Sequence, residues 1–168
     1  DQCKQAAQNL IKEAGMSSNQ PPKLGNIPRD LYERYKETLP GVLRRRAEHF
    51  FSEQQRVHQG IELWKRGDMK KFGRLITASG RSSIDNYECG NQYLRDAYNV
   101  LRETPGVLGA RFSGAGFRGC CVGLMKHPPS RDLCQDILSR YTRRNPDMEG
   151  HAGVSWCSSD NGAELIST

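Results

Sequence analysis

The spacing of apolar residues changes once along this sequence, near Thr104-Pro105-Gly106. Before that point apolar residues recur every three or four positions, which is the period of an amphipathic helix. After it, short apolar runs lie between glycine-rich stretches and around one further helix, a pattern typical of strands joined by turns. Helices first and strands afterwards favour an α+β domain, in which helices pack on one face of a mostly antiparallel sheet.

Helices are predicted where an amphipathic run begins at a capping residue and ends at glycine or proline. Asp30 and Asp68 are the expected N-caps of two helices, and Gly15 and Gly67 are expected to end two others. Residues 16–27, rich in Ser, Asn, Pro and Gly, are expected to form a loop. The predicted helices cover residues 3–14, 31 to about 40, 42–66, 69 to at least 76, and 92–103.

The helix over residues 42–66 has the strongest apolar pattern. Residues at three- and four-residue spacing share one face of a helix, and this face is expected to pack into the core. We also expect Phe51 in the core rather than on a stacking platform. The predicted inward face comprises Leu43, Ala47, Phe50, Val57, Ile61 and Trp64.

Four strands and a helix are predicted in the last third of the chain. Residues 107–112 are strand-like, and residues 120–125 form a short apolar run suited to a buried strand. Pro128-Pro129 is expected to open a helix that runs through Tyr141. Residues 154–156 and 163–166 are expected to form two more strands, joined by a turn at Asp160-Asn161-Gly162.

The net charge of +6 raises the question of an anionic partner. The 25 basic residues are dispersed and interleaved with 19 acidic ones, which favours a solvated basic surface over a nucleic-acid site. A small anion such as a nucleotide or sugar phosphate also fits this charge. No apolar stretch approaches the length of a membrane span, so no membrane partner is expected.

Six cysteines occur without a C-x-x-C pair, so a zinc site is not expected. A reduced, intracellular compartment, the cytoplasm, is the simplest interpretation. Cys120 and Cys121 lie in an apolar run, where burial would raise the thiol pKa and make Cys120 a poor nucleophile. His49 and Glu53 are interpreted as a helical surface pair rather than as metal ligands. Asp85 and Glu88 are interpreted as turn and helix-start residues.

A glycine loop joins the two strand-like runs at 107–112 and 120–125. Glycine can take positive φ, and converging backbone N–H groups can hold phosphate oxygens. The absence of a G-K-[ST] after the glycines excludes a Walker loop, and the strand-like character of residues 120–125 argues against a dinucleotide fingerprint, which needs a helix there. The pattern alone leaves a tight turn with packing glycines equally open. The candidate substrate- or nucleotide-binding residues are Ser113, Gly114, Ala115, Gly116, Phe117, Arg118 and Gly119.

The segment Ala110–Cys120, A-R-F-S-G-A-G-F-R-G-C, resembles the third conserved motif of galactokinases, which reads A-R-M-T-G-G-G-F-G-G-C. Galactokinases are members of the GHMP small-molecule kinase superfamily. Residues 45–53 are similar to the family's R-R-A-x-H-V-V-x-E helix, and residues 67–75 resemble its G-D-x-x-x-F-G-x-L-M. Residues 82–88 are similar to its S-L-R-D-D-Y-E, and residues 160–163 to its D-G-A. The resemblance covers nearly the whole chain.

Two positions in the glycine motif depart from the galactokinase pattern. Ala115 stands where that pattern has glycine, and Arg118 stands where it has the glycine after Phe. The S-G-A-G-F-R-G-C form is similar to plant galacturonokinases, relatives that act on a sugar acid. Our hypothesis is that the Arg118 guanidinium helps to hold a sugar carboxylate or a phosphate.

The resemblance implies a single GHMP-kinase C-terminal domain over 1–168, ferredoxin-like, with a helical lead-in at 1–40 and a core at 41–168. It implies ATP and Mg²⁺ as cofactors, and galacturonic acid or galactose as the sugar phosphorylated at its anomeric hydroxyl. The family's phosphate loop, sugar-recognition segment and catalytic Asp and Arg lie upstream and have no match here. We therefore expect a fragment that lacks its N-terminal half, carries no catalytic residue or metal ligand, and is inactive alone. A non-catalytic sugar-sensing protein of the same fold is the alternative.

Overall fold

A computed structural model describes residues 1–17, 21–117 and 119–158. The chain divides into two compact units, Asp1–Lys126 and His127–Thr168. The prediction of one domain over the whole chain stays a prediction. The described residues include no helix that is both long and apolar enough to cross a membrane.

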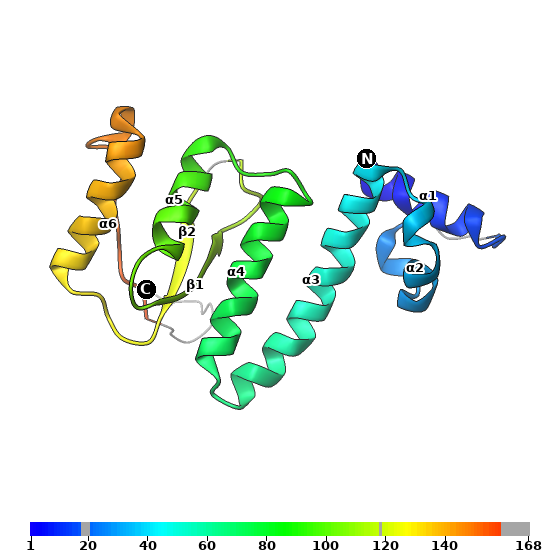
Figure 1. Cartoon of the computed structure of the whole chain (residues 1–168), viewed down its shortest axis with the longest axis horizontal. Helices are drawn as coiled ribbons and strands as arrows, with labels where there is room; N and C mark the ends of the chain where they lie inside the picture. Colours follow the sequence, from blue (N-terminus) through cyan, green and yellow to red (C-terminus); the bar gives the residue numbers. More distant parts are fainter. Residues whose placement is uncertain (18–20, 118, 159–168) are drawn as a thin grey trace, which may run out of the picture. The chain divides into compact units, whose positions relative to one another are not determined.

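The first unit begins with short helices that pack on one end of a long one (Figure 1). These elements are α1 (Gln2–Glu13), η1 (Leu24–Asn26), α2 (Arg29–Tyr35), η2 (Lys36–Thr38) and α3 (Gly41–Lys65). Tyr32 and Phe51 stack with ring centroids 4.1 Å apart at the centre of this core. The expected capping role of Asp30 is wrong, because Pro28 takes the N-cap position and Asp30 lies in the first turn.

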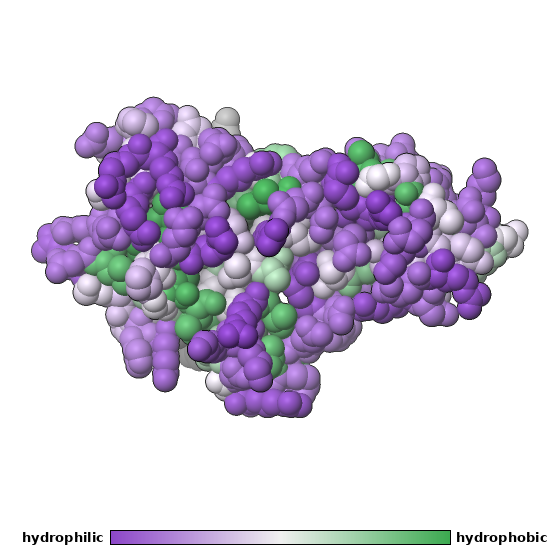
Figure 2. All heavy atoms as spheres, in the orientation of Figure 1, coloured by the Kyte–Doolittle hydropathy of each residue, from purple (hydrophilic) through white to green (hydrophobic). Residues whose placement is uncertain are grey.

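The predicted length of α3 is correct, but three of the six residues predicted to face the core are exposed. Ala47 and Phe51 are buried, whereas Val57, Ile61 and Trp64 are 58%, 48% and 55% exposed. Only the first half of α3 faces α1, whereas α4 is a neighbour of both halves. Trp64 contacts Phe72 of α4 edge-on, at 5.2 Å between ring centroids. On the face seen in Figure 2, groups of hydrophobic residues lie among a majority of hydrophilic ones.

The second half of the first unit places helices against a two-stranded antiparallel sheet, so the α+β prediction is confirmed. The elements are α4 (Met69–Asp85), α5 (Gln92–Arg102), β1 (Val107–Phe112) and β2 (Cys121–Met125). β1 and β2 pair in a register that sets Phe112 opposite Cys121. Both α4 and α5 contact β1.

Glycines bring α4 and β1 together at their backbones. A Cβ on Gly73 would lie 2.3 Å from the carbonyl oxygen of Leu108, and one on Gly109 would lie 2.0 Å from the carbonyl oxygen of Gly73. The Thr77 hydroxyl of α4 accepts a 3.3 Å hydrogen bond from the Ala110 N–H of β1. The F-G pair of the sequence motif at 72–73 is therefore a packing feature of this fold.

Several local predictions for this region need correction. β2 is not a buried strand, since Val122 is 47% exposed, and Cys120 is also exposed. Most helix contacts of the sheet fall on β1, whereas β2 packs mainly on β1 and α5, and this leaves part of β2 exposed. Ser82 and Ser83 do not precede a helix but lie inside α4, which ends at Asp85.

The second unit contains α6 (Arg131–Arg144) and η3 (Pro146–Met148). The Ser130 hydroxyl caps α6 by accepting from the Leu133 N–H at 3.1 Å. The helix therefore begins just after Pro128-Pro129, as expected, and continues beyond Tyr141. Residues 154–156 are described and form no strand, because no described strand of this unit pairs with them. The predicted turn at 160–162 and strand at 163–166 lie outside the described residues.

Candidate functional site

The segment 113–119, hereafter the arch, joins β1 to β2. The Ser113 N–H donates to the Cys120 carbonyl at 2.9 Å and closes its base. Gly114 and Gly119 have φ of +79° and +110°, and a Cβ on Gly114 would have no described atom within 4 Å. These two glycines therefore serve backbone conformation in an open, exposed loop rather than tight packing.

Gly116 has a different role from Gly114 and Gly119. It is buried, its φ is +80°, and a Cβ there would lie 2.9 Å from the Phe112 ring and 3.1 Å from the Gly90 nitrogen. A Cβ on Gly90 would meet the same ring at 2.5 Å, so Phe112 fits between the two glycines. In the arch, Gly116 is therefore required for close packing, whereas Gly114 and Gly119 are required for their backbone conformation.

The arch is anchored on the segment 86–91 between α4 and α5, hereafter the connector. The Asn91 N–H donates to the Gly116 carbonyl at 3.2 Å, and the Asn91 side-chain amide donates to the Phe117 carbonyl at 3.0 Å. The Asn91 side-chain oxygen caps α5 by accepting from the Leu94 N–H at 2.9 Å. Asn91 was not predicted as a site residue, although its position three residues before an apolar helical run is a recognisable capping signal.

Two arginines of α3 hold the connector through one carboxylate. Glu88 accepts from Arg45 and Arg46 at 2.6 Å each, and Arg46 also donates to the Gln2 side chain at 2.7 Å. Hydrogen bonds from Arg46 and Arg45 lower the pKa of the Glu88 carboxyl. Glu88 has a left-handed φ of 58°, which is uncommon for a residue with a side chain. The interpretation of Glu88 as a helix-start residue is therefore wrong: it is an ion-pair centre.

A second polar cluster lies between α3 and α4. His49 Nδ1 is 3.0 Å from the Ser82 hydroxyl, and Glu53 accepts from the Ser79 hydroxyl at 2.8 Å. Burial lowers the pKa of the His49 imidazole. The predicted surface pair is thus incorrect, since His49 and Glu53 each bind α4. In the described part of the chain no group of three or more His, Cys, Asp or Glu could hold a metal ion.

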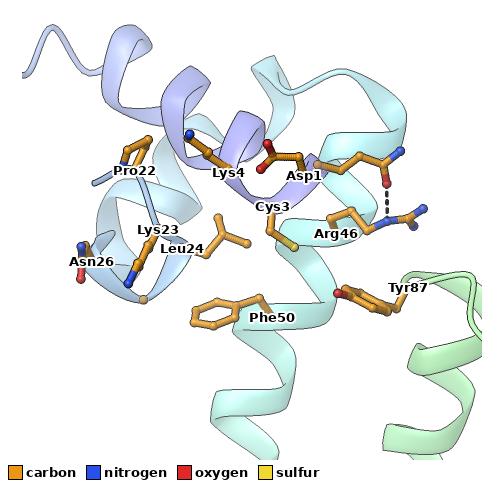
Figure 3. A pocket seen from close by; sticks show the side chains of 12 residues that line it. Asp1, Cys3, Lys4, Pro22, Lys23, Leu24, Asn26, Arg46, Phe50 and Tyr87 are labelled. Carbon is orange, nitrogen blue, oxygen red and sulfur yellow. Dashed lines mark hydrogen bonds between the residues drawn. The ribbon is translucent and has the colours of Figure 1, made fainter. Parts of the chain in front are cut away.

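A pocket of about 720 Å³ lies among α1, η1 and α3, beside the contacts that Arg46 makes with Gln2 and Glu88 (Figure 3). Its lining includes Lys4, Lys23, Phe50 and Tyr87, and none of its lining residues belongs to the arch. The Arg46 guanidinium at its edge donates to Gln2 and lies 5.7 Å from the Tyr87 ring centroid. This cation therefore acts within the protein, as a support for the connector.

Comparison with known proteins identifies the family. Residues 61–143 match the family model described as GHMP kinases C terminal. A galacturonokinase from Arabidopsis thaliana is 40% identical over 98% of this chain, and a galactokinase from Enterococcus faecalis is 34% identical over 98%. The chain belongs to the GHMP kinases.

The match to this family extends to three dimensions. The crystal structure of Lactococcus lactis galactokinase complexed with galactose aligns with 85% of this GHMP kinase chain, at a TM-score of 0.72 and 25% identity. The chain spans 40% and 41% of the lengths of the two curated relatives, and 36% of the galactokinase in the crystal structure.

Two sequence segments that resemble galactokinase motifs meet in this GHMP kinase chain. Arg45 and Arg46 come from the segment 45–53, and Glu88 comes from the segment 82–88. Their ion pairs join α3 to the connector that carries Asn91. These motif residues therefore support the arch through the connector, while Ser113, Gly114, Ala115 and Phe117 of the arch are exposed.

Proposed function

We propose that this chain is the C-terminal part of an ATP-dependent sugar 1-kinase that phosphorylates galacturonic acid at its anomeric hydroxyl, with galactose as the other candidate substrate. The observation that carries the proposal is the exposed arch, built on left-handed glycines and anchored on its inner side by Asn91. An open glycine loop of this kind offers backbone N–H groups to phosphate or carboxylate oxygens. The identity to a galacturonokinase and to galactokinases supports the sugar class.

The arch would meet one requirement of phosphoryl transfer, the positioning of an anionic group. This reaction depends on positioning and on neutralising charge, with ATP supplying the phosphoryl group and Mg²⁺ screening it. We infer that the Mg²⁺ ligands and the catalytic Asp and Arg of the family lie in the part of the relatives that this chain does not span. The proposed share of this chain is to bind and orient an anionic group, and the chain alone is expected to be inactive.

Galacturonic acid is preferred over galactose for two reasons. The chain is 40% identical to the galacturonokinase and 30–34% identical to galactokinases such as those of Clostridium acetobutylicum and Enterococcus faecalis. Arg118 also places a permanent cation in the arch where galactokinases have glycine, and a planar guanidinium suits a carboxylate. Residue 118 itself lies outside the described residues, so this assignment rests on sequence and chemistry.

The test is an assay of the intact protein for ATP consumption with galacturonic acid and galactose, with the product's phosphate position determined by NMR. We expect a 1-phosphate of galacturonic acid. Arg118→Gly should raise KM for galacturonic acid by about tenfold, the worth of one charge-assisted hydrogen bond, with a smaller effect on galactose. Sugar binding without turnover would support the sugar-sensing alternative, and unchanged KM values in the variant would remove the role of Arg118.

A further inference from the structure

We propose that Asn91 is a positioning residue that sets the direction of the peptide groups in the arch, and so decides whether the arch presents N–H groups or carbonyls to an anion. This inference rests on the proposed function, because it assumes that the arch binds an anionic group of the substrate or the nucleotide. Asn91 lies in the connector and is no part of the glycine motif.

Asn91 meets the arch and α5 with separate atoms. Its side-chain oxygen accepts from Leu94 N–H, its side-chain NH₂ donates to the Phe117 carbonyl, and its backbone N–H donates to the Gly116 carbonyl. This orientation of the amide gives its nitrogen an acceptor and its oxygen a donor, so the assignment of the two atoms follows from the partners. Asn91 thus joins the start of α5 to two successive carbonyls of the arch.

The directions of these carbonyls fix the direction of an N–H group. In a trans peptide the C=O of one residue and the N–H of the next point to opposite sides, and no described peptide bond is cis. Because the Gly116 carbonyl points toward Asn91, the N–H of Phe117 points away from the connector. Phe117 as a residue is 69% exposed.

The Asn91 main-chain N–H can hold the Gly116 carbonyl with almost any side chain at position 91, whereas the Phe117 carbonyl depends on the Asn91 side-chain NH₂. Without that NH₂ group the Phe117 carbonyl could turn outward. Glycines on both sides of the anchored residues tolerate large changes of φ, so the arch has little intrinsic preference for one orientation. A carbonyl turned outward would present a partial negative charge to an anion in place of a donor. Two hydrogen bonds to one residue hold both carbonyls inward before a ligand arrives, which is preorganisation of a binding site.

Asparagine can cap α5 with its side-chain oxygen and hold the Phe117 carbonyl with its NH₂ group, and substitutions can remove these two functions separately. Asp, Ser and Thr also cap helices through a side-chain oxygen, but only Asn among the strong N-cap residues has an NH₂ group beside that oxygen. Asn91→Ser keeps a neutral cap and removes the donor to the Phe117 carbonyl. Asn91→Ala removes the cap and this donor, and both variants keep the main-chain hydrogen bond from residue 91 to the Gly116 carbonyl. Asp68→Ala is the matched control, because Asp68 caps α4 by accepting from the Lys71 N–H, and Asp68 is not in the arch or the connector.

The experiment uses the intact protein and measures two quantities for each variant. One is the dissociation constant of galacturonic acid and of ADP by calorimetry, which does not depend on turnover, and the other is the melting temperature. We expect Asn91→Ser and Asn91→Ala to weaken binding of one of these ligands by a similar factor, about fivefold or more. Only Asn91→Ala should lose a few degrees of melting temperature. Asp68→Ala should lose stability and bind normally.

Three results would overturn the positioning role. One is wild-type affinity in Asn91→Ser, another is a loss of affinity that follows melting temperature across all three variants, and the third is an intact wild type that binds neither ligand. A wild type that binds galacturonic acid or ADP and transfers no phosphate refutes the proposed kinase activity alone. In that case the affinities of the variants still decide the role of Asn91.

Discussion

Replacing Gly73 by alanine tests how closely α4 packs on β1. The added Cβ would lie 2.3 Å from the Leu108 carbonyl oxygen and 2.5 Å from its carbon, distances at which side-chain Cβ atoms are essentially not found. Helix and strand would have to separate by roughly 0.7 Å to bring the nearer contact to about 3.0 Å. The two nearest atoms are backbone and the third is the Leu108 Cβ, which is fixed to the backbone, so no side-chain rotation can relieve the clash.

Two opposing effects determine the size of the change. Overpacking of a close contact costs about 1–3 kcal/mol and more where only backbone can move, whereas glycine to alanine within a helix contributes about 1 kcal/mol of stability. Because the clash involves three atoms of Leu108, we expect a net loss of about 2 kcal/mol, with a melting temperature lower by about 4–8 °C.

The assay is thermal and urea unfolding of Gly73→Ala beside Gly41→Ala. Gly41 begins α3, and a Cβ added there would have no described atom within 4 Å, so its variant should match or slightly exceed the wild type. A Gly73→Ala protein as stable as the wild type, or more so, would refute the reasoning. Helix propensity alone predicts a gain of stability in Gly73→Ala, so the sign of the stability change shows whether the close backbone contact is real.

Two further predictions concern ionisable groups. Because its ion pairs with Arg45 and Arg46 lower the folded-state pKa of Glu88, these pairs stabilise the fold above the ordinary glutamate pKa of 4.5 and are lost as pH falls through the lowered value. Glu88→Gln should therefore reduce the loss of stability on acidification in urea titrations from pH 7 to 3, and an unchanged acid slope would contradict the ion pairs. Burial raises the pKa of the Cys121 thiol to about 12, whereas Cys120 is exposed, so alkylation at pH 8 followed by mass spectrometry should modify Cys120 before Cys121. Modification of Cys121 at an equal rate would contradict its burial.

The sequence predicts local structure well wherever neighbouring residues decide it. β1 spans the predicted residues 107–112, and Asp68 caps α4 as its spacing indicates. Gly67 ends α3 with a φ of +69°, a conformation that glycine takes readily. Capping, turn formation and helical periodicity depend on residues within one turn of each other, so they can be inferred without the tertiary structure.

Burial and the support of the candidate site depend on distant partners. The apolar period of α3 places Ala47 and Trp64 on one face. The period alone does not predict that α1 covers Ala47 and leaves Trp64 exposed. Glu88 acts through arginines more than forty residues earlier, and Asn91 through a loop 26 residues later. No periodic pattern carries information about such pairings. The arch itself was found from its glycines, whereas the residues that hold it became visible only in the structure.

The most direct test of the account is to follow backbone amide signals of the intact protein by NMR during titration with galacturonic acid and with ADP. The account predicts that signals of Ser113 to Phe117 shift with saturation, and that signals of exposed residues in α3 such as Val57 stay in place. If the ligands bind while the arch signals remain unchanged, the arch is no anion site and the central claim is contradicted.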